Sequence, residues 1–92
     1  MVVIVVESVP AGLRGELSRW MLEPHAGVFV GTISAMVRDK LWEKVSRESK
    51  EGHALLLYRA QNEQGFAMRT HGEARREVWD VEGLSLVRCI SL

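Results

Sequence analysis

The sequence predicts one α+β domain spanning residues 1–92, and three patterns lead to this prediction. Val2 to Val6 form a continuous β-branched run, which is typical of a strand buried on both faces. Two later segments place apolar residues at helical spacing, and further short apolar segments lie between turn residues. Because a 92-residue chain has a small core, association of subunits would bury further apolar area, and we expect a homodimer.

The first helix is expected to begin at Pro10, since the first turn of a helix tolerates the missing proline N–H. It should end at Glu23-Pro24, because the residue before a proline avoids the α region. The residues at positions i, i+4, i+7 and i+8 form its apolar face: Leu13, Leu17, Trp20 and Met21.

A short strand bracketed by glycines, Gly27 to Gly31, precedes the second helix, for which Ser34 is a suitable N-cap. Gly52 follows the end of this helix. Its expected core stripe is Val37, Leu41, Trp42 and Val45, and its expected exposed ion pairs are Glu43/Arg47 and Lys44/Glu48.

A hairpin is predicted next, with strands at Ala54–Ala60 and Phe66–His71. In the second of these strands, Phe66, Met68 and Thr70 should share one face. Right-handed crossovers and two helices on one face of a four-stranded sheet then predict a ferredoxin-like architecture. Short strands are also expected at 78–81 and 84–90. The strand at 84–90 would be a fifth strand, one more than the four-stranded sheet needs. Its exposed edge should therefore pair with a second subunit or with another protein.

The charged residues of the chain bear on whether it binds nucleic acid. The formal net charge is zero, which argues against a general attraction to nucleic acid, but nine Arg against three Lys favour local phosphate contacts. The alternative is that these Arg residues are solvated and paired with acids.

The lone Cys89 is expected in the core, which excludes thiol catalysis and a zinc site. The first apolar run is too short to span a membrane and lacks signal-peptide features, so we expect a cytoplasmic protein without membrane association.

Glu7 follows the apolar part of the first strand and is the candidate site residue. A carboxylate at the end of a central strand is held by the sheet and can still meet solvent, a metal ion or a neighbouring subunit. Two other readings remain open: Glu7 is the first solvated residue after the strand, or it favours the positive N-terminus of the next helix.

Several motifs together resemble the small CRISPR-associated adaptation protein of type I-E systems, which belongs to the second Cas family and is the partner of the Cas integrase. The motifs cover nearly the whole chain: Val5 to Pro10, Leu13-Arg14-Gly15, Trp20 to Glu23, Ala26 to Gly31, Ser34 to Arg38, Trp42-Glu43, Gly65-Phe66, Thr70 to Gly72, Arg75-Arg76 and Asp80 to Leu86.

The resemblance implies a ferredoxin-like homodimer at the centre of the integrase complex. Such a dimer clamps the middle of a double-stranded protospacer DNA without reading its sequence and helps to set spacer length. The C-terminal segment 78–92 corresponds to the part that docks the integrase. The chain departs from relatives at Gly12, His25 and Met36, where basic residues are often found. The residues that correspond to phosphate contacts are Arg14, Arg38, Arg75 and Arg76.

For Glu7 the resemblance implies a catalytic and metal-binding role, with Mg²⁺ held between the two Glu7 carboxylates of a dimer. The alternative function is therefore a metal-dependent endonuclease acting on single-stranded RNA or double-stranded DNA. Type I-E relatives are best regarded as structural, and no further acid, His or Lys has a spacing that marks it as a ligand or base. A small-ligand-binding regulator is a third possibility on fold alone, without a Gly-rich phosphate loop to support it.

Overall fold

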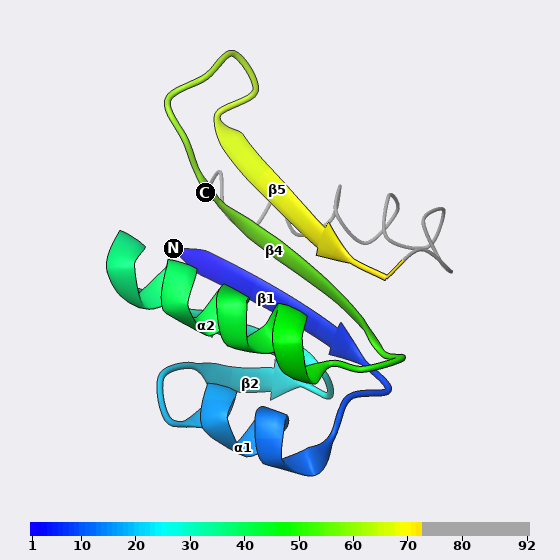
Figure 1. Cartoon of the computed structure of the whole chain (residues 1–92). Helices are drawn as coiled ribbons and strands as arrows, with labels where there is room; N and C mark the ends of the chain where they lie inside the picture. Colours follow the sequence, from blue (N-terminus) through cyan, green and yellow to red (C-terminus); the bar gives the residue numbers. More distant parts are fainter. Residues whose placement is uncertain (73–92) are drawn as a thin grey trace.

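Strand β1 (Val2–Glu7) lies at the centre of a five-stranded antiparallel sheet with the order β2-β3-β1-β4-β5 (Figure 1). The computed structural model describes residues 1–72. The other elements of this part are α1 (Ala11–Ser18), β2 (Leu22–His25), β3 (Val28–Gly31), α2 (Ala35–Glu48), β4 (His53–Arg59) and β5 (Phe66–His71). The architecture is mixed α+β, and the order of its first four strands is consistent with a ferredoxin-like fold.

Strand β1 is hydrogen-bonded on both sides, to β3 with Val2 opposite Gly31 and to β4 with Val2 opposite Tyr58. Its five apolar residues are all at most 6% exposed. The prediction of a strand buried on both faces is therefore confirmed, because alternate side chains enter two different apolar clusters.

Both helices lie on the same face of the sheet and cover the larger cluster (Figure 1). This cluster contains Val2, Ile4, Val6, Leu13, Leu17, Met21, Phe29, Leu41, Val45, Ala54 and Leu56. The opposite face carries a second buried cluster, which we call the helix-free-face cluster: Val3, Val5, Leu55 and Leu57, with Val28, Val30 and Phe66 packed against it. The sheet thus has two apolar faces.

The predicted extent of the first helix was wrong, and the sequence patterns did not reveal β2. Helix α1 ends at Ser18, and Trp20 is 50% exposed instead of lying on an apolar helix face. The residues after it form β2, which pairs with β3 through Leu22 opposite Val30. Pro24 lies in this strand because an edge strand tolerates a missing N–H.

The other predicted elements within residues 1–72 are confirmed. The Ser34 hydroxyl accepts a hydrogen bond from the Val37 N–H at 3.2 Å and caps α2, and Leu41 and Val45 of its stripe are buried. The four strands whose order is consistent with a ferredoxin-like core are β1 to β4. The assignment of Phe66–His71 to that core was wrong, because β2 takes its place and β5 lies beyond the four. The predicted strands at 78–81 and 84–90, and Cys89, lie outside the described residues.

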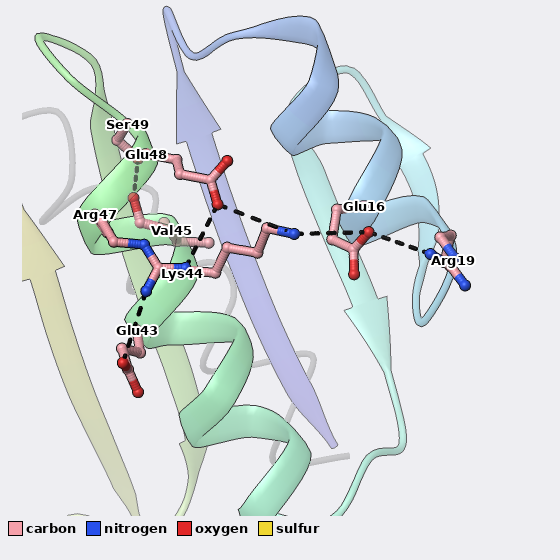
Figure 2. A network of polar contacts seen from close by, with 8 residues as sticks. All are labelled: Glu16, Arg19, Glu43, Lys44, Val45, Arg47, Glu48 and Ser49. Atoms are coloured by element: carbon pink, nitrogen blue, oxygen red, sulfur yellow. Dashed lines mark hydrogen bonds and ion pairs between the residues drawn. The ribbon is translucent and has the colours of Figure 1, made fainter.

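The two helices are joined by an ion pair on their exposed surface. Figure 2 shows Lys44 of α2 between Glu16 of α1 and Glu48 of its own helix, with Nζ 3.9 Å from a carboxylate oxygen of each. Arg47 lies beside it, with guanidinium nitrogens 3.8 Å from both Glu43 and Glu48. The predicted i,i+4 pairs of α2 are therefore present.

Neither α1 nor α2 is long and apolar enough to cross a membrane.

Candidate functional site

Glu7 ends β1 on the face of the sheet that carries no described helix. Because side chains alternate along a strand, it shares this face with Val3 and Val5, away from the helices. Its cross-strand partner in the β1–β4 register is His53, the first residue of β4. The structure therefore makes a carboxylate and an imidazole cross-strand neighbours at the end of the central strand, beside the helix-free-face cluster.

His53 was not identified from the sequence, and its environment is unusual. Its Nδ1 atom is buried and has no hydrogen-bond partner within residues 1–72. The backbone of Gly72 passes so close to the ring that any Cβ at that position would collide with Nδ1. A buried polar atom without a hydrogen-bond partner carries a desolvation cost, so His53 Nδ1 is unfavourable for folding as the described residues place it.

Arg14 lies on α1 and donates from Nη2 to Oε2 of Glu23 at 2.7 Å. The same oxygen accepts the Gly27 backbone N–H at 2.8 Å. The pKa of Glu23 lies below its usual value, chiefly because of the Gly27 hydrogen bond and then because of Arg14. One carboxylate thus positions Arg14 and closes the β2–β3 turn.

Arg38 stacks on Tyr58, with its guanidinium carbon 3.8 Å from the ring centroid. Its Nε donates to Oδ1 of Asp39 at 3.0 Å, and its side chain is only 16% exposed. Cation–π stacking and the ion pair together hold this guanidinium in one orientation.

A second arginine, Arg69 of β5, meets the same two partners. Its Nη1 lies 3.2 Å from Oδ1 of Asp39, its Nη2 donates to the Tyr58 hydroxyl at 3.1 Å, and its guanidinium carbon is 5.4 Å from the ring centroid. The pKa of Asp39 is lowered, first by the hydrogen bond from Arg38, while the pKa of Arg69 is raised, first by its bond to Tyr58. We call Arg38, Asp39, Tyr58 and Arg69 the double-arginine cluster.

Residues 1–86 match the family described as CRISPR-associated protein (Cas_Cas2CT1978). The chain belongs to this family. As a member of a Cas2-type family it is a CRISPR-associated protein, and the family resemblance seen in its motifs is confirmed at this level.

In this Cas2-family protein the structure describes two of the four predicted DNA contacts, Arg14 and Arg38. Arg14 and Arg38 lie on different helices, and each has its own carboxylate partner. Arg75 and Arg76 lie outside the described residues. Arg69 was not identified from the sequence. It lies opposite Leu56 in the β4–β5 pair and therefore on the face of the sheet that the helices cover, where it can contact α2.

Mg²⁺ prefers an octahedral shell of oxygen ligands. Glu7 supplies carboxylate oxygens, whereas its neighbour His53 supplies nitrogen. Within residues 1–72 there is no group of three or more His, Cys, Asp or Glu side chains arranged to hold a metal ion. A Mg²⁺ ion held between the Glu7 carboxylates of two subunits stays a prediction.

Proposed function

We propose that this protein is a structural, DNA-clamping subunit of a type I-E CRISPR adaptation complex. In this proposal a homodimer associates with the Cas integrase in the cytoplasm and holds double-stranded protospacer DNA during its insertion into the CRISPR array. The family match over residues 1–86 is the observation that carries the proposal.

The arginines of the described part support a clamping role. Arg14 and Arg38 are both held in place by carboxylates, and Arg38 is also stacked on an aromatic ring. Arginine binds phosphate oxygens through fixed pairs of N–H donors, and phosphate contacts position a duplex without reading its bases. A protein that handles DNA of arbitrary sequence requires contacts of this kind.

The size of the chain supports association of two subunits, because a 92-residue domain has a small core and shared burial would enlarge it. The helix-free-face cluster is not the surface for this association, since Val3, Val5, Leu55 and Leu57 are at most 6% exposed within the chain itself. Segment 78–92 would contribute by adding its strand to the second subunit and by docking the integrase.

The proposal is tested by producing the full chain with its integrase and measuring three quantities: co-purification, duplex binding and spacer acquisition in cells that lack the native gene. We expect all three to depend on this protein. A chain truncated after Gly83 serves as the matched variant and should lose integrase association and part of its dimer stability. Acquisition that proceeds equally well without the protein would contradict the proposal.

An endonuclease remains the second candidate function, because one specific observation favours it. Glu7 and the partly buried His53 are cross-strand neighbours, and a carboxylate beside an imidazole is suited to move protons. The substrate would be single-stranded RNA or double-stranded DNA, and Mg²⁺ would be expected only if this activity exists. Incubation of rigorously purified protein with both substrates, with and without Mg²⁺, separates this function from clamping.

A further inference from the structure

We propose that Arg38 and Arg69, held against the ring of Tyr58, form a seat for one phosphate of duplex DNA, and that Asp39 occupies this seat when DNA is absent. This inference rests on the proposed function and adds Arg69, Tyr58 and Asp39 to the DNA-binding surface. Three elements, α2, β4 and β5, contribute to the seat.

The position of one carboxylate oxygen carries the argument. Oδ1 of Asp39 lies 3.0 Å from Nε of Arg38 and 3.2 Å from Nη1 of Arg69, so two guanidinium groups converge on a single acceptor. A phosphate oxygen makes the same charge-assisted hydrogen bonds to arginine as a carboxylate oxygen does. The point between the two guanidinium groups is therefore chemically suited to a phosphodiester.

Charge and exposure allow an exchange of occupants. Two guanidinium groups face one carboxylate, which leaves an excess positive charge at the cluster. Asp39 is 51% exposed and Arg69 is 40% exposed, so a backbone phosphate can approach from solvent while the Asp39 side chain turns outward. The Asp39–Arg69 pair lies at the surface, where an ion pair contributes little to folding, so its disruption costs little.

The guanidinium groups are also ordered before DNA arrives. Stacking at 3.8 Å restrains Arg38, and the Tyr58 hydroxyl fixes one end of Arg69 at 3.1 Å. A binding site whose side chains are already ordered loses less conformational entropy when its ligand binds. Tyr58 therefore acts as the positioning residue of the seat.

Arg47 offers a contrast on the same helix. A single guanidinium there faces two carboxylates, Glu43 and Glu48, at 3.8 Å each, so that site has no excess positive charge (Figure 2). Substitution of Arg47 removes the same formal charge as substitution of Arg69 but should remove no phosphate contact. It is the matched control.

The test measures binding of a fluorescently labelled duplex of mixed sequence to the full-length protein, alone and with the integrase, by anisotropy over a range of salt concentrations. Arg69→Gln should weaken binding about threefold or more and reduce the log–log salt slope by about 0.9, the amount expected for one lost phosphate contact. Asp39→Asn should tighten binding, because it removes the competing negative charge and leaves both arginines in place. Arg47→Gln should change binding less than Arg69→Gln.

The inference is overturned if Arg69→Gln and Arg47→Gln behave alike, or if Asp39→Asn weakens binding. It is also overturned if Arg69→Gln loses the integrase while duplex binding by the protein alone is unchanged, since the cluster would then contact protein. If Arg69→Gln does not fold, Asp39→Asn carries the test alone. Failure of the wild-type protein to bind duplex, even with the integrase, would contradict the proposed function as well.

Discussion

The Glu23 carboxylate accepts the backbone N–H of Gly27 at 2.8 Å and thereby closes the turn between β2 and β3. Arg14 donates to the same oxygen at 2.7 Å. One acidic side chain therefore connects α1 to the hairpin that forms the edge of the sheet. Both hydrogen bonds are stronger to the ionised carboxylate than to the protonated acid, which is why the pKa of Glu23 is lowered.

We predict that Glu23 contributes stability at neutral pH that is lost in acid. Because its folded-state pKa is depressed, this contribution is complete above the unfolded glutamate pKa of about 4.3 and disappears as pH falls through the lower folded value. Glu23→Gln should therefore unfold at lower urea than wild type at neutral pH, and the difference should shrink at about pH 3. Glu63→Gln, in the exposed β4–β5 loop, is the control. A difference that does not change with pH would contradict this assignment.

Two glycine-to-alanine substitutions should have opposite effects on the free energy of unfolding. Gly27 has φ +80°, and a Cβ there would lie 2.6 Å from the Val6 carbonyl oxygen, so Gly27→Ala should destabilise by about 1–3 kcal/mol. Gly15 lies in α1 with open space around it, and Gly15→Ala should stabilise by about 0.5–1 kcal/mol. Urea denaturation of both variants measures the two values. Equal effects would show that backbone conformation is not the cause.

The fold could be predicted wherever the residues of a segment show the hydrophobic spacing or capping that is typical of its secondary structure. The β-branched run of β1, the capped stripe of α2 and the β4–β5 hairpin all correspond to the structure. Strand β2 could not be predicted, because its four residues are all exposed, include Pro24 and show no alternation. It forms through pairing with β3 and not through local preference.

The site was predictable only in part, for a related reason. Glu7 follows an evident strand, so its position at the end of that strand could be inferred. Its neighbour His53 becomes visible only through the β1–β4 register. Arg69 likewise gains its role from contacts with Asp39 and Tyr58, which belong to other elements. These residues become neighbours only in the folded chain, so the spacing of residues along the sequence does not reveal them.

The family resemblance predicts that Arg75 and Arg76 contact the DNA backbone. Replacing both by Ala should weaken duplex binding by the assembled complex equally for all sequences, since phosphates carry no base identity. The log–log salt slope should fall by about 0.9 for each lost contact. Salt titrations with two duplexes of different sequence provide the measurement. A loss confined to one sequence, or an unchanged slope, would argue against backbone clamping by this pair.

Spacer acquisition by Glu7→Ala, measured together with Mg²⁺-dependent cleavage by the purified variant, tests the structural role most directly. If the protein clamps DNA and does not cut it, the variant should fold, form the integrase complex and support acquisition close to the wild-type level. Glu7→Gln is the matched variant, because it keeps the size of the side chain while removing its charge. Loss of acquisition by both variants, with the dimer and the integrase complex intact, would contradict the structural role and favour catalysis at Glu7.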